Sequence, residues 1–104
     1  MRIITPTDFT GTRAWDAQLI ERFTGATTVR LHWTDQPYRW HVNDGPEVFV
    51  VLSGMVDMHA RENGVETIHP MRPGDIFHVR AGGAHVAHPQ GPAHVLVIER
   101  EGSV

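Results

Sequence analysis

The sequence predicts an all-β fold, in which short strands form a sandwich or a closed barrel. Clusters of turn residues recur roughly every 8 to 14 positions along the chain, a spacing typical of such folds. The segments between the turns are rich in valine, isoleucine, threonine and aromatic residues, which favour strands. A length of 104 residues fits one domain with one core. We therefore expect a single domain over residues 1–104 with about eight strands.

The first two strands are expected at residues 17–23 and 27–34. The short turn between them, at 24–26, contains a glycine, and this arrangement predicts a hairpin. The competing interpretation is a short helix over Thr12–Phe23, because large apolar residues recur there at every fourth position.

The middle of the chain shows the clearest strand pattern. The sequence NDGP at 43–46 is a turn in front of an apolar segment at 47–53. Residues 54–61 alternate between apolar and polar side chains, which is the period of a half-buried strand. The next turn, at 62–64, contains Asn-Gly and so supplies the two positive φ angles of a type I′ hairpin, from which a strand returns over 65–69.

The C-terminal part continues the pattern of short strands separated by glycine–proline turns. Turns at 71–75 and 89–92 contain both residue types. Strands are expected between and after them, at 76–80, 85–88 and 93–100. A short chain with so many strands protects their edges by closing the sheet or by stacking two sheets.

The chain shows no internal domain boundary, repeat or low-complexity tract. We expect residues 1–27 to form an N-terminal covering segment and residues 28–100 to form the barrel. The longest apolar run, Val48–Leu52, is too short to span a bilayer. The N-terminal residues lack an apolar run of signal-peptide length. These observations predict a cytoplasmic protein that has no membrane partner.

The composition excludes several kinds of site. The chain has no cysteine, so a metal site would have nitrogen and oxygen ligands only. The net charge is -3 with histidine neutral, and no run of arginine occurs, so we expect no nucleic-acid partner. The chain has eight histidines, and histidine is the commonest metal ligand and a frequent acid or base.

Four polar residues stand out once the strands are placed. His41 and Asn43 are two positions apart, so their side chains share one face of a strand. Glu47 begins the next strand, where a carboxylate is costly to bury without a partner. His85 begins a strand much later in the chain. Two imidazoles and one carboxylate form a 2-His-1-carboxylate set, which leaves open positions on an ion such as Fe(II).

The spacing of these residues resembles the two motifs of the cupin superfamily. At the positions of the first motif the chain has His41, Asn43, Glu47 and Gly54, and at those of the second it has Gly74, Gly82 and His85. It departs from the motifs at Asp35, Asn43, Arg80 and Pro89, where they have glycine, histidine, proline and asparagine. The resemblance implies a single-domain cupin, a jelly-roll β-barrel with a metal near its axis. The implied ligands are His41, Glu47 and His85, with Asn43 either a poorer amide ligand or a simple turn residue.

The other histidines and the aromatic residues have mainly structural roles in this plan. His59 and His69 flank the Asn-Gly turn and are expected to face solvent, and His88 should point away from the interior. For His32, His78 and His94, facing the barrel and packing on a sheet remain alternatives. The expected core contains Trp33, Tyr38, Trp40, Phe49, Phe77, Met55 and Met58.

Three functional hypotheses follow. The first is a metal-dependent enzyme of dioxygenase or isomerase type, which uses Fe, Mn, Ni or Zn on a small oxygen-rich substrate. The alternative is a non-catalytic module that binds or senses a sugar or another small effector. The third is metal-free acid–base catalysis by barrel histidines. It needs an inward acidic partner, and Asp44 is the only clear inward aspartate that the strand pattern predicts.

We also expect a homodimer. The N-terminal segment would form its interface, because a covering strand at a two-fold axis protects a sheet edge. The apolar residues expected there are Trp15, Leu19 and Phe23.

Overall fold

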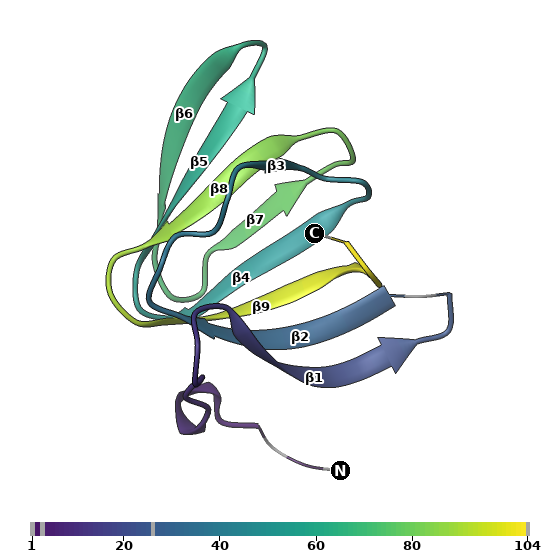
Figure 1. Cartoon of the computed structure of the whole chain (residues 1–104), viewed down its shortest axis with the longest axis vertical. Coiled ribbons are helices and arrows are strands. Elements are labelled where there is room, and N and C mark those ends of the chain that lie inside the picture. The colour runs from purple at the N-terminus through teal and green to yellow at the C-terminus, as the bar shows by residue number, and fades with distance from the viewer. Residues whose placement is uncertain (1, 3, 26, 104) are drawn as a thin grey trace.

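The computed structural model describes residues 2, 4–25 and 27–103 and has an all-β fold (Figure 1). The only helical element in these residues is the 3-10 turn η1 (Pro6–Asp8). The strands are β1 (Asp16–Phe23), β2 (Thr27–Thr34), β3 (His41–Val42), β4 (Glu47–Ser53), β5 (Val56–Glu62), β6 (Val65–Met71), β7 (Ile76–Val79), β8 (Ala84–Pro89) and β9 (Ala93–Arg100). The all-β prediction is confirmed. No helix in the described part of the chain has the length and apolarity needed to cross a membrane.

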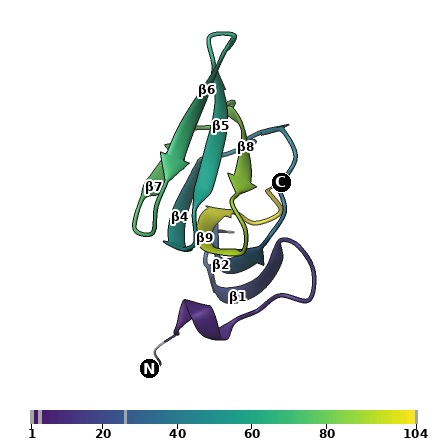
Figure 2. The ribbon, with the colours of Figure 1, turned by 90° about the vertical axis from the view of Figure 1, so that its left-hand side faces the viewer.

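The strands form two antiparallel sheets. One has the order β1-β2-β9-β4-β7 and the other the order β3-β8-β5-β6. Figures 1 and 2 show the β5–β6 hairpin extending beyond the rest of the molecule at one end, with η1 at the opposite end. The non-consecutive neighbours place β3 beside β8 and β4 beside β9. Segments far apart in sequence are therefore adjacent in space.

The core lies between the two sheets. In β4 the alternate residues Glu47, Phe49 and Val51 are buried, and in β5 Val56 and Met58 are fully buried. Because side chains alternate across a strand, these residues face inward from opposite sheets, and the apolar ones pack together in one cluster. The alternation predicted for residues 54–61 is confirmed. Of the other expected core residues, Phe77 packs against this cluster, and Trp33, Tyr38, Trp40 and Met55 are partly buried.

The N-terminal strands form the predicted hairpin, and the helix interpretation of residues 12–23 is wrong. β1 pairs antiparallel with β2 along its length, with an irregularity in register between Leu19 and Glu21. Part of the connecting turn, Ala26, lies outside the described residues. In this arrangement β1 is an edge strand of the five-stranded sheet. The division of the chain at residues 27 and 28 stays a prediction.

The turn between β5 and β6 has the conformation that its sequence predicts. Asn63 has a φ of 52° and Gly64 a φ of 77°, as a type I′ turn requires. Asn-Gly is the pair that adopts these angles at the least cost. The turn fixes the β5–β6 register, which places Asp57, His59 and Arg61 on the outer face of β5.

Candidate metal centre

Three polar side chains from three strands meet at the inner surface of the two sheets. His41 on β3 and His85 on β8 are register partners, and their ring centroids are 4.4 Å apart. Glu47 is the first residue of β4, in the opposite sheet, and accepts a hydrogen bond of 2.8 Å from Nε2 of His85. One potential ligand atom of each residue lies within 4.8 Å of the other two. No other group of three His, Cys, Asp or Glu side chains in the described residues meets that condition.

The His85–Glu47 pair is buried, and this determines its electrostatics. Only 2% of His85 and 7% of Glu47 is exposed. Burial opposes ionisation of Glu47, but the hydrogen bond and charge of His85 outweigh it and hold the pKa of Glu47 below its usual value. Each group therefore compensates the other for the loss of water. Nδ1 of His85 is also buried and has no hydrogen-bond partner in the described structure.

His41 is oriented by the backbone. Its Nδ1–H donates a hydrogen bond of 2.9 Å to the carbonyl oxygen of Arg39. A carbonyl can only accept, so the Nδ1 proton is fixed and Nε2 of the neutral ring keeps its lone pair. Metal-binding histidines commonly show this arrangement, in which one nitrogen binds the ion and the other donates to a carbonyl. The edge of Tyr38 packs against the ring at a centroid distance of 5.2 Å.

The residues present fit a divalent transition metal. Two imidazoles and one carboxylate are ligands that Fe, Mn, Ni and Zn accept. Two ligands about 2.1 Å from one ion and at right angles lie about 3 Å apart, and the His85 Nε2–Glu47 Oε1 distance is 2.8 Å. An ion can therefore take the place of the proton between them with little movement. Because Nδ1 of His85 has no partner, that ring can carry its proton there while Nε2 binds.

Asn43 differs in placement from the other three. It is 3% exposed, and neither atom of its side-chain amide has a hydrogen-bond partner in the described structure. Its backbone N–H and C=O bond to Gly83 and Gly82, so it holds the loop in front of β8. Asn43 is not among the residues that line the cavity beside His41, Glu47 and His85. Its role as a ligand stays a prediction.

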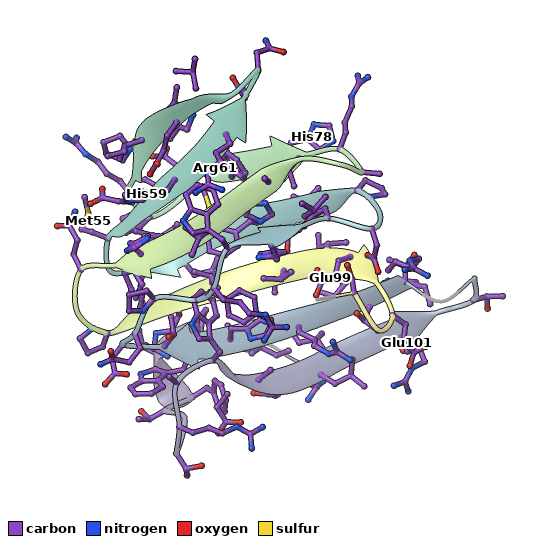
Figure 3. All side chains as sticks on the ribbon, turned by 45° about the horizontal axis from the view of Figure 1, so that its top comes forward. Met55, His59, Arg61, His78, Glu99 and Glu101 are labelled. Carbon is purple, nitrogen blue, oxygen red and sulfur yellow. The ribbon has the colours of Figure 1, made fainter. Side chains whose placement is uncertain are left out.

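Glu99 on β9 belongs to the site but was missed by the sequence analysis. It lies opposite Glu47 in the register of β9 and β4, and the two carboxyl groups share a hydrogen bond. Burial and the adjacent charge of Glu47 raise the pKa of Glu99 to about 8. The pair therefore holds one proton at neutral pH. Figure 3 shows Glu99 on β9, just before the C-terminal turn that carries Glu101.

A cavity of about 210 Å³ adjoins these residues. Its walls mix aromatic and apolar side chains with a few polar groups, as ligand sites do. Besides His41, Glu47 and His85, the lining includes Trp15, Arg30, His32, Tyr38, Phe49 and Glu99. The volume is below the range of about 300 to 1,000 Å³ typical of drug-sized ligands, so the cavity suits a small molecule.

The remaining histidines divide between the cavity and the surface. His32 lines the cavity, and burial lowers its pKa, so the ring is neutral. His94 is buried away from the cavity, where Nε2–H donates to the carbonyl of Phe9 and Nδ1 accepts from Ser53. His78 is exposed on the edge strand β7. The outward expectations hold for His59 and His88, whose rings stack on the outer face at 4.1 Å, and His69 is exposed as expected.

The expectation that Asp44 points inward is wrong. Asp44 is exposed, and its carboxylate binds Arg100 at 2.5 Å and the hydroxyl of Ser103 at 2.6 Å. It therefore ties the β3–β4 turn to the C-terminal turn. The acidic groups that face the interior at this end are Glu47 and Glu99.

Comparisons with known proteins identify the fold. No family model and no curated protein matches the sequence. A cupin-2 domain protein from Shewanella frigidimarina superposes with a TM-score of 0.78 over 95% of each chain, at 19% identity. Hydroxypropylphosphonic acid epoxidase from S. wedmorenis gives a TM-score of 0.70 at 13% identity, over 80% of this chain and 49% of the enzyme. The Fe(II) form of HppE in complex with substrate gives 0.69 at 16% identity, over 81% and 53%.

The chain therefore has the cupin fold, a double-stranded β-helix, as its two motifs predict. At these identities the likeness shows the fold and does not assign an activity.

Proposed function

We propose that this chain is a small metal-binding cupin, which acts as a metal-dependent enzyme of dioxygenase or isomerase type on a small oxygen-rich molecule. The observation that carries the proposal is the convergence of His41, Glu47 and His85 from three strands onto one point beside a cavity. A chain has no packing reason to bury His85 and Glu47 beside a second imidazole, because an imidazole and a carboxylate are both costly to desolvate. The likeness to the fold of an Fe(II) protein is consistent with such a centre.

Each residue has a defined task in this proposal. A bound divalent ion would supply Lewis-acid or oxygen-activating chemistry. His41, Glu47 and His85 bind the ion and leave coordination positions open toward the cavity. Phe49 contributes an apolar wall to the cavity, where electrostatic interactions are stronger than in water. Glu99 holds a proton beside Glu47 and is placed to exchange it with a substrate in the cavity.

The metal site is tested by elemental analysis of protein purified without a histidine tag. We expect about one divalent ion per chain in the wild type and a large loss in His85→Ala. His78→Ala is the matched control, because His78 is exposed on β7 and lies outside the site. Equal metal content in both variants, or none in the wild type after incubation with Fe, Mn, Ni and Zn, would contradict the proposal.

The enzymatic part needs a separate measurement. Protein loaded anaerobically with Fe(II) is mixed with enols, diketones, catechols or sugars, and oxygen uptake and products are followed. Turnover that disappears in His85→Ala and persists in His78→Ala supports the dioxygenase form. Thermal stabilisation by one of these compounds without any product supports instead the non-catalytic binding protein.

A second candidate is metal-free proton transfer, which the His85–Glu47 hydrogen bond favours. This hypothesis ranked last on sequence grounds because Asp44 was the only clear inward aspartate. Asp44 is exposed, but Glu47 lies 2.8 Å from Nε2 of His85 and supplies the acidic partner. A buried histidine–carboxylate pair can take a proton from a substrate and return it elsewhere. Isomerase activity that survives a chelator but is lost in both His85→Ala and Glu47→Gln would favour this mechanism over the metal-dependent one.

We further propose a homodimer that forms along the edge strand β1. Leu19 is 41% exposed and Phe23 54% exposed on this edge strand. Trp15, which the sequence analysis grouped with them, instead packs against the core and lines the cavity. Light scattering should give the mass of two chains, and Phe23→Ser should lower it. A monomeric wild type would refute the dimer, and the cytoplasmic location stays a prediction.

A further inference from the structure

The cavity contains a second set of polar groups, on the β2 side and away from His41, Glu47 and His85. Arg30 lies on the inner face of β2 and lines the cavity. Its register partner is Val97 on β9, which in turn pairs with Phe49 on β4. Two strand spacings, about 10 Å, therefore separate the backbone of Arg30 from that of β4. A ligand that reaches both ends of the cavity would touch the metal ligands at one end and Arg30 at the other.

The guanidinium of Arg30 has no partner among the described residues. Five other arginines form ion pairs with carboxylates or lie over aromatic rings: Arg13, Arg22, Arg39, Arg61 and Arg100. Arg30 does neither, although it is partly buried. The nearby acidic groups are engaged elsewhere, because Glu47 binds His85 and Glu99 binds Glu47. A side chain that lines the cavity thus carries a planar fork of five donors without a partner among the described residues.

Trp15 provides a second donor without a partner. Its indole Nε1–H is buried and forms no hydrogen bond to residues 2, 4–25 or 27–103. Trp15 lines the same cavity as Arg30, between edge contacts with the rings of His32 and Tyr38. Its φ is 58°, a backbone conformation that is rare and strained for a bulky residue. A strained residue that lines a cavity and has a buried donor without a partner is more typical of a binding site than of a packed core.

We propose that Arg30 and Trp15 form a subsite for the oxyanion of a small organic acid, a carboxylate or a phosphonate. The guanidinium fork matches the two oxygens of such a group, and the indole N–H supplies a further donor. The small volume of the cavity restricts the ligand to a short-chain acid. The inference rests on the proposed function in one respect: oxygen atoms at the other end of the acid would bind the metal held by His41, Glu47 and His85.

The subsite is tested with two probe acids, malate and lactate. Both carry a hydroxyl next to a carboxylate, which can chelate a metal, but only malate has a second carboxylate. Binding is measured by isothermal titration calorimetry on Zn²⁺-loaded wild type, Arg30→Gln and Trp15→Phe. Arg72→Gln is the matched control, because Arg72 is exposed and does not line the cavity.

We expect malate to bind the wild type more tightly than lactate does. Arg30→Gln should weaken malate binding by about 10- to 100-fold, because a charge-assisted pair is lost. The affinity for lactate should stay unchanged. Trp15→Phe keeps an aromatic ring but removes the N–H donor, and should weaken malate binding by about 3- to 10-fold. Arg72→Gln should bind both acids as the wild type does. Equal affinity of the wild type for the two acids, or equal malate affinity in Arg30→Gln and Arg72→Gln, would overturn the inference.

The same titrations separate this inference from the proposed function. Zn²⁺ affinity is measured in each variant, and an unchanged value in Arg30→Gln shows that the fold and the metal ligands are intact. If the wild type binds no Zn²⁺ but binds malate in a way that depends on Arg30, the metal proposal fails and the subsite stands. If Zn²⁺ binds and malate is insensitive to Arg30→Gln, the subsite fails and the metal site stands.

Discussion

The proton shared by Glu47 and Glu99 should make the stability of the fold depend on pH. In the folded protein the pKa of Glu99 is about 8, and its ordinary value is 4.5. Between these pH values the unfolded chain has released a proton that the folded chain retains. Stability therefore falls as the pH rises through this range, because unfolding is accompanied by proton release. Glu99→Gln should abolish this fall, since an amide cannot ionise but can still donate a hydrogen bond to Glu47.

The size of the effect is limited by solvent. One proton retained completely in the folded state changes the free energy of unfolding by about 1.4 kcal/mol per pH unit. Glu99 is only partly buried, so water screens its interaction with Glu47 and reduces that value. We expect a total of about 1 to 2 kcal/mol between pH 5 and pH 9 after this reduction. At pH 9, Glu99→Gln should be more stable than the wild type by this amount.

The assay is urea unfolding at pH 5, 7 and 9 in the presence of a chelator, which keeps metal binding out of the comparison. Glu62→Gln is the control, because Glu62 is exposed and forms no ion pair within the described residues. The difference between each variant and the wild type cancels titrations common to both. If the stability of Glu99→Gln follows the wild type in parallel from pH 5 to pH 9, the shared proton is refuted.

Three further predictions concern the core, a turn and the acid side of the pH range. Met58→Ala should lower the free energy of unfolding in urea by about 2 to 5 kcal/mol, because Met58 is fully buried between the sheets. Val65→Ala on the exposed hairpin is the control and should change the free energy of unfolding by less than about 0.5 kcal/mol. Gly64→Ala should lower the free energy of unfolding by about 1 to 2 kcal/mol in thermal unfolding, because an L-residue is strained at positive φ. Gly45→Ala is the control, because its new Cβ would meet Arg100 at an ordinary 3.7 Å. An equal loss of stability in the control would contradict the reasoning. Glu47→Gln should be less stable than the wild type at pH 7. In acid unfolding the difference should narrow as the pH falls from 4.5 through the lower pKa of Glu47 in the folded protein, because the lowered pKa contributes its full stability only above 4.5. A difference independent of pH would contradict this reasoning.

The strand plan could be predicted from sequence because its turns have distinctive residues. The Asn-Gly turn and the alternation of residues 54–61 fix β5 and β6, including which side chains face inward. The N-terminal strand was ambiguous for a physical reason. Trp15, Leu19 and Phe23 are spaced as on a helix, but Trp15 lies outside β1 and the register is irregular after Leu19. A strand with an irregular register loses the period of two that would identify it.

The sequence indicated three residues that lie together in the structure, but not the groups that surround them. The motif spacing indicated His41, Glu47 and His85, but their convergence depends on the β3–β8 pairing, which brings together residues far apart in the chain. Glu99 was hidden because β9 is apolar on both faces, so its inward parity with Val97 does not show as an alternation. The polar groups on β2 depend likewise on which face of the strand turns inward, and the sequence alone does not decide this.

The network around Glu47 compensates a buried carboxylate through groups that also suit a metal ion. A carboxylate at the start of a buried strand needs compensation, and Glu47 receives a hydrogen bond from His85 and shares another with Glu99. The His85–Glu47 bond contains a proton that a cation could replace at a similar distance. Under the proposed function, a metal ion would therefore compete with protons for Glu47, whose charge is already compensated. Its occupancy should rise with pH for this reason, and the apo fold should keep the same arrangement of strands because the carboxylate is satisfied in both states.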